Sequence, residues 1–179
     1  MTSTLERLDT ATAGFRRRLD GLTDGQLEAP SPCEGWTARD VVDHTIGAIV
    51  MVSDFVGDPT EVDPGDEPLA RFDAAAAGLR AKVADEALAG TVVDSPFGDL
   101  ALKQLVSSIV IHDLVVHTWD LARATGGDEQ LDADLVTRTL NQMLPLDQQL
   151  RGHGFAEQVE VDPGADDQTR LLCFLGRRP

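Results

Sequence analysis

Cysteine is scarce in this sequence, and its scarcity excludes several kinds of structure. The two cysteines, Cys33 and Cys173, lie far apart along the chain. A zinc cluster built on thiolates needs more cysteines at closer spacing, and a structural disulfide is uncommon in a reducing compartment. We therefore interpret both residues as ordinary thiols.

Long apolar runs and an excess of positive charge are also missing. No uninterrupted apolar run reaches the roughly 18 residues of a membrane span, and the amino-terminal segment lacks the apolar stretch of a signal peptide. The net charge of −16 would repel nucleic-acid phosphate and anionic membrane surfaces. We expect a cytoplasmic monomer or homodimer whose partners are a divalent cation and small molecules, with no nucleic acid and no membrane.

The sequence predicts a single all-α domain over residues 1–179, because its apolar residues recur mainly at helical spacing. The segments expected to be helical are Thr4 to about Gly21, Ala38 to about Val56, Leu69 to Leu88, Leu100 to Thr125 and Asp132 to about Leu150. Residues 90–99 fit either an extended piece or a loop, and the closing RLLCFLGRRP fits either a strand or a helical turn. The sum is a four- or five-helix bundle with short extra elements.

Local signals mark where some of these helices begin and end. Thr37 followed by Asp40 predicts a capping box, and the proline-rich segment before it predicts a loop over residues 28–36. Gly126 and Gly127 predict the end of the longest helix, and Pro145 predicts a break in the last long one.

Polar residues interrupt the apolar stripe of the longest predicted helix. The stripe is defined by Leu102, Leu105, Val106, Ile109 and Val110. Continuing at the same period leads to Asp113, His117 and Asp120. A buried carboxylate without a partner is costly, so we expect something to compensate for it. Asp113 and His117 are four residues apart and therefore meet on one face of the helix.

The helix that begins at Ala38 carries a similar anomaly at His44. Its expected buried stripe is Val41, Ala48, Val52 and Phe55. His44 lies in line with this stripe, and Gly47 leaves open space one turn on. If the two helices face each other, His44, Asp113 and His117 form a set that suits a zinc, nickel or ferrous ion. The alternative is a buried Asp–His hydrogen-bonded pair without a metal.

Three other residues with reactive side chains are weaker candidates. His112 lies about 100° round the helix from Asp113, so we interpret it as structural. His153, between two glycines, is interpreted as a solvated loop residue. Cys33 lies near the start of a helix, where the helix dipole could activate its thiol, but metal chemistry is the preferred interpretation.

The aromatic and basic candidates also have a structural and a functional interpretation. Trp36 and Trp119 could line a pocket, although core packing is the more common role of tryptophan. Arg39 and Arg123 could clamp a substrate carboxylate and are the candidate substrate-binding residues. The alternative is that both arginines are solvated residues on helix surfaces.

Two segments, SPCEGWTARDVVDH and IHDLVVHTWDLARATG, resemble the actinobacterial branch of the DinB-like metalloenzyme superfamily. That branch includes the amino-terminal domain of mycothiol-dependent maleylpyruvate isomerase. The resemblance covers nearly the whole chain, and the closing DQTRLLCFLGRRP is similar to the end of a short stand-alone subgroup. It implies a four-helix bundle with a metal in its core. The implied ligands are His44, Asp113 and His117, with Asp120 fixing the His117 imidazole.

The resemblance also has two departures. The isomerase has glutamate where this chain has Asp113, and it carries a carboxy-terminal α/β domain for which this chain has no room. The implied function is therefore broader than that of the isomerase. A divalent metal would hold mycothiol, a low-molecular-weight thiol, as a thiolate that attacks a small electrophile, giving S-transfer or isomerisation. The alternatives are a non-catalytic metal- or thiol-binding protein of stress response or storage, and a metal-dependent hydrolase.

Overall fold

The computed structural model describes residues 2–96, 98–150 and 156–179, so that His153 lies outside the described residues. The chain divides into two compact units, Met1–Glu129 and Gln130–Pro179. Both units are mostly helical, which confirms the predicted all-α class. The assignment of residues 1–179 to one domain stays a prediction.

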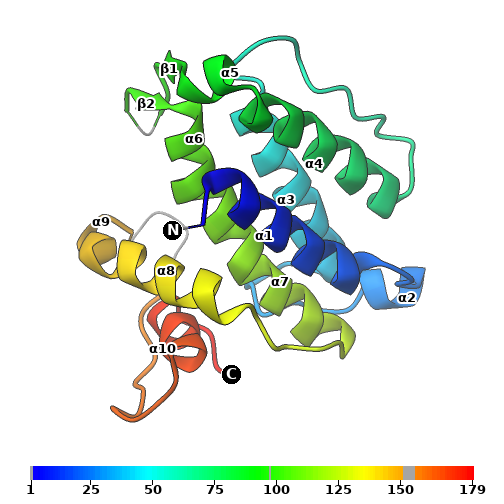
Figure 1. The fold of residues 1–179 in the computed structure, drawn as a ribbon. Helices are drawn as coiled ribbons and strands as arrows, with labels where there is room; N and C mark the ends of the chain where they lie inside the picture. The colour runs from blue at the N-terminus through cyan, green and yellow to red at the C-terminus, as the bar shows by residue number, and fades with distance from the viewer. Residues whose placement is uncertain (1, 97, 151–155) are drawn as a thin grey trace. The chain divides into compact units, whose positions relative to one another are not determined.

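Four long helices build the first unit (Figure 1). They are α1 (Thr4–Leu19), α3 (Ala38–Ser53), α4 (Pro68–Ala84) and a continuous helix that joins α6 (Leu102–Leu105), η1 (Val106–Val110) and α7 (Ile111–Thr125). Helices α1 and α3 each contact both α4 and α7, so the four helices surround one core. This arrangement is the predicted four-helix bundle.

Short elements complete the first unit. They are the helices α2 (Asp24–Leu27) and α5 (Glu86–Gly90) and the strands β1 (Val92–Val93) and β2 (Leu100–Ala101). The two strands pair antiparallel, with Val92 opposite Ala101 and Val93 opposite Leu100. Residues 90–99 therefore contain a short extended piece at Val92–Val93, which was one of the two alternatives that the sequence left open.

Helix ends in this unit follow the local chemistry of the sequence. The Thr37 side chain accepts a hydrogen bond from the Asp40 backbone N–H, and the Asp40 carboxylate accepts one from the Thr37 N–H. This pair is the predicted capping box at the start of α3. Helix α7 ends at Gly126, whose φ of 71° is in the left-handed region that favours glycine.

The continuous helix from Leu102 to Thr125 is the central element of the bundle. By length and apolar composition it could cross a membrane, but most of its apolar stretch is buried inside the protein. This burial is typical of a core helix. The η1 segment within it is a π-helical turn, which accommodates more residues per turn than an α-helix. Side chains after η1 therefore point in different directions around the helix axis than they would in an uninterrupted α-helix.

The second unit consists of α8 (Ala133–Met143), η2 (Leu144–Leu146), α9 (Asp147–Leu150) and α10 (Asp167–Phe174). Helices α8 and α10 pack against each other. Pro145 lies in η2, a 3₁₀ turn, which confirms the predicted break. The first five residues of the closing RLLCFLGRRP form the end of helix α10, so the helical alternative for this segment is the correct one.

Candidate metal centre

Helices α3 and α7 bring His44, Asp113 and His117 together. The Nε2 atom of His44 lies 3.0 Å from Asp113 Oδ1, and the Nε2 atom of His117 lies 3.4 Å from the same oxygen. One donor atom from each of the three side chains lies within 4.8 Å of the others. A tetrahedral zinc ion would space its nitrogen and oxygen ligands about 3.3 Å apart, given the usual bond lengths. Both nitrogen–oxygen distances are therefore close to those around one ion.

The Asp113 carboxylate has one oxygen without a partner. Its Oδ1 faces both imidazoles, whereas Oδ2 is buried and has no hydrogen-bond partner among the residues that the structure describes. An acceptor left in this state costs roughly 1–3 kcal/mol, and more if it is charged. A cation bound by both carboxylate oxygens would supply the missing interaction. The donor set therefore fits a divalent ion both in spacing and in charge.

Asp120 holds the other side of the His117 ring. This carboxylate is fully buried, and its Oδ2 lies 2.9 Å from His117 Nδ1. When Nδ1–H donates to Asp120, the other ring nitrogen, Nε2, is directed at Asp113. Carboxylates commonly orient metal-binding imidazoles in this way. The geometry suits the role predicted for Asp120, which stays a prediction until metal binding is measured.

Without a metal, His117 is a cation surrounded by acceptors. Burial disfavours the charged ring, but the Asp113 charge, hydrogen bonds with Asp120 and Cys33 and the Asp120 charge outweigh burial and raise the pKa of His117 to about 10. The ring proton therefore compensates the two carboxylates where a metal would otherwise do so. Metal and proton compete for the same ring nitrogen.

The loop before α3 is closed by its own backbone. Pro30 and Thr37 form an isolated antiparallel bridge, and the Ser31 N–H donates to the Trp36 carbonyl at 2.8 Å. Gly35 has a φ of 78°, which a residue with a side chain rarely adopts. The loop is thereby fixed as a compact turn directly before the helix that carries His44.

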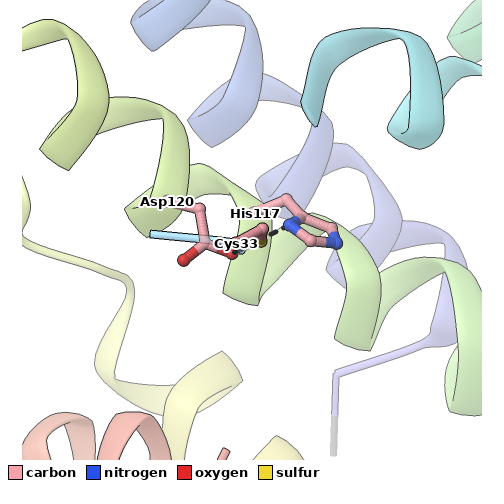
Figure 2. Close-up of side chains that lie close together, drawn as sticks. All are labelled: Cys33, His117 and Asp120. Carbon is pink, nitrogen blue, oxygen red and sulfur yellow. Dashed lines mark hydrogen bonds and ion pairs between the residues drawn. The ribbon is translucent and has the colours of Figure 1, made fainter. Parts of the chain in front are cut away.

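This loop supplies two residues to the site that the sequence analysis interpreted as ordinary. The Trp36 ring centroid lies 5.0 Å from that of His44 and 6.2 Å from that of His117. The Cys33 Sγ lies 3.5 Å from Asp120 Oδ2, and Figure 2 shows the two side chains beside the His117 ring. The sequence signal that could have identified them is their position in the SPCEGW segment, where Trp36 lies eight and Cys33 eleven residues before His44.

The predicted burial is wrong for His44 and correct for Trp119 and His112. The side chain of His44 is 43% exposed, so its placement on the buried stripe of α3 is wrong. The buried apolar residues of α3 are instead Ala38, Val41, Val42, Ile46, Ile49 and Val52. The space predicted beside Gly47 is present, since an added Cβ would meet nothing there. Trp119 and His112 are both buried, as their structural interpretation required.

The two candidate substrate-binding arginines both have carboxylate partners. Arg39 pairs with Glu28 at 2.9 Å, and Arg123 pairs with Glu129 at 2.7 Å. The Arg123 guanidinium also lies over the Trp119 ring, 4.6 Å from its centroid. These contacts are sufficient to explain both residues structurally. Their role in substrate binding stays a prediction.

Fold and site together define a helical bundle with a set of potential metal ligands between facing helices. Residues 8–66 match the model of the family described as the mycothiol maleylpyruvate isomerase N-terminal domain. Two uncharacterized proteins from two strains of Mycobacterium tuberculosis are each 32% identical to this chain over 176 residues, which cover 93% of both sequences. No solved structure gives a significant match. The chain belongs to the mycothiol maleylpyruvate isomerase N-terminal domain family.

The extent of these matches differs across the site. The family match includes Cys33, Trp36 and His44 but ends before Asp113 and His117. The two mycobacterial relatives match over nearly the whole chain. The assignment of ligands on α7 therefore depends on the geometry of this protein and not on the family match.

Proposed function

We propose that the protein is a divalent-metal-dependent enzyme that uses mycothiol, a low-molecular-weight thiol, for S-transfer to a small electrophile or for its isomerisation. The observation that carries the proposal is the imidazole–carboxylate–imidazole set in which Asp113 Oδ2 has no partner. The family supports the choice of mycothiol as the thiol.

In this proposal His44, Asp113 and His117 hold the ion, which would be zinc, nickel or ferrous iron. A divalent ion lowers the pKa of a thiol that it coordinates, so that the thiol binds as a thiolate at neutral pH. Asp120 keeps the proton of His117 on Nδ1 and so leaves Nε2 free to bind. Three protein ligands leave positions open for the thiol.

The surroundings of the set suit a small-molecule reaction. The half-exposed His44 and the open space at Gly47 leave one side of the set accessible to solutes. The Trp36 ring covers both imidazoles and offers an apolar wall against which a substrate can be oriented. If Arg39 or Arg123 binds a substrate carboxylate, it must share or leave its own carboxylate partner.

Isothermal titration with mycothiol tests the proposal. It is run on the zinc-loaded protein, on the metal-free protein and on His117→Ala, with S-methylated mycothiol as the matched ligand that cannot form a thiolate. We expect binding of mycothiol to the zinc-loaded protein alone, and weaker binding of the methylated ligand. Equal thiol affinity with and without metal would overturn thiol activation and leave the hydrolase and storage interpretations.

A further inference from the structure

The His117 ring presents its second nitrogen to a second set of donors. Asp120 Oδ2 lies 2.9 Å from His117 Nδ1 and 3.5 Å from Cys33 Sγ. Figure 2 shows these three side chains close together, and one donor atom from each lies within 4.8 Å of the others. The set therefore combines one sulfur, one nitrogen and one oxygen donor.

The spacing of these donors is close to that around a tetrahedral ion. Usual zinc bond lengths place a thiolate sulfur about 3.5 Å from a carboxylate oxygen, and an imidazole nitrogen about 3.3 Å from it. The sulfur–oxygen distance already agrees, and the nitrogen–oxygen distance needs to widen by a few tenths of an ångström. His117 and Asp120 both lie on α7, so small rotations of their side chains are sufficient for this adjustment.

The two donor sets depend on opposite protonation of the same ring. A neutral imidazole has one lone pair and one N–H. When Nε2 binds an ion beside Asp113, Nδ1–H donates to Asp120. When Nδ1 binds an ion beside Asp120, Nε2–H is directed at Asp113, 3.4 Å away. Each carboxylate thus accepts a hydrogen bond from the ring N–H when the ion is bound at the other donor set.

We propose that Cys33, His117 and Asp120 form a second metal site, for a thiophilic cation, and that its occupation excludes occupation of the His44–Asp113–His117 set. Thiolate ligands favour soft metals, which separates this site from the nitrogen and oxygen set by metal type. On binding to the metal-free protein, the Cys33 S–H proton and the Nδ1 proton of the His117 cation pass to solvent, and Nε2 keeps its proton. Only the exclusion rests on the proposed function; the cysteine site stands independently of it.

Cadmium is the probe for the cysteine site. The metal-free protein is titrated with Cd²⁺ while the ultraviolet sulfur-to-cadmium charge-transfer band is recorded. We expect the band to saturate at one ion per chain. Cys33→Ser should remove the band and weaken Cd²⁺ binding at least tenfold. Cys173→Ser, the matched control at the other cysteine, should retain both. His44→Ala should also retain the band, because His44 belongs only to the first set.

Exclusion is tested by competition. Protein loaded with one Ni²⁺ per chain is mixed with Cd²⁺, desalted and assayed for both metals. We expect each bound Cd²⁺ to release one Ni²⁺, so that the total stays at one ion per chain. A total of two ions would overturn exclusion. A band that survives Cys33→Ser, or no band in the folded unchanged protein, would overturn the site and leave Cys33 as a hydrogen-bond donor to Asp120.

The same experiments separate this inference from the proposed function. If Ni²⁺ does not bind but a Cys33-dependent cadmium band appears, the His44–Asp113–His117 set and exclusion both fail while the cysteine site stands. If Ni²⁺ binds and the cadmium band is absent, the His44–Asp113–His117 set stands, and the cysteine site and exclusion both fail. Circular dichroism of each variant verifies that the helices are intact.

Discussion

Replacing Asp120 by Asn would show whether this buried carboxylate prepares His117 for metal binding. The substitution keeps the size of the side chain at a fully buried position and removes its charge. The new amide can donate to Nδ1, which would place the ring proton on Nε2, the nitrogen that must bind the ion. Loss of such a carboxylate typically weakens metal affinity about 10–100-fold, or roughly 1.4–2.7 kcal/mol. We expect a loss in this range.

The assay is competition for Ni²⁺ against a chromophoric chelator. Asp73→Asn is the matched control, because it makes the same change of charge at an exposed carboxylate that pairs with Arg16 at 2.9 Å, in contact with neither donor set. Screening by salt should keep the effect of Asp73→Asn on the Ni²⁺ affinity below about twofold. Equal losses in both variants would show that net charge alone sets the affinity. An unchanged affinity in folded Asp120→Asn would refute the role of the carboxylate.

Three further predictions concern the same site. His117→Ala should abolish Ni²⁺ binding and lower the free energy of unfolding by about 3–5 kcal/mol, because it leaves the buried Asp120 and the partly buried Asp113 without a partner cation; urea denaturation measures the loss. Asp113→Glu keeps the charge and should retain Ni²⁺, while the added methylene costs at most about 1–3 kcal/mol at this partly exposed position; titration and urea denaturation measure both. The free energy of unfolding of the metal-free protein should fall as pH rises from the ordinary histidine value of 6.5 to about 10, because over this range the folded protein keeps the His117 proton that the unfolded chain has lost. The fall should be absent in His117→Ala, and a flat profile in the unchanged protein would contradict the raised pKa.

The features that could be predicted from the sequence are local ones. The capping box of Thr37 and Asp40 and the end of α7 at Gly126 depend on residues next to each other in the chain. The proximity of Asp113 and His117 follows from their helical spacing alone. These features do not depend on how the helices pack, so the sequence was sufficient for them.

The features that could not be predicted depend on packing between distant segments. Helix α3 is apolar on more than one side, and its contacts with both α4 and α7 decide which side is buried. Periodicity alone therefore misplaced His44 on the buried stripe. The contact between Cys33 and Asp120 joins residues 87 positions apart, and Cys33 lies in a loop, where no periodicity applies. The π-helical turn before Asp113 likewise left no signal in the stripe of apolar residues.

The most direct test of the central claim is a crystal of the protein soaked with Ni²⁺ and measured at the nickel absorption edge. The account predicts one anomalous peak per chain, about 2.0–2.2 Å from His44 Nε2, an Asp113 oxygen and His117 Nε2. The two imidazoles and the carboxylate should lie around it with little movement from their present positions, and Asp120 should remain hydrogen-bonded to His117 Nδ1. A nickel peak elsewhere, or no peak in a crystal where these three side chains keep their positions, would contradict the claim that they form the metal centre.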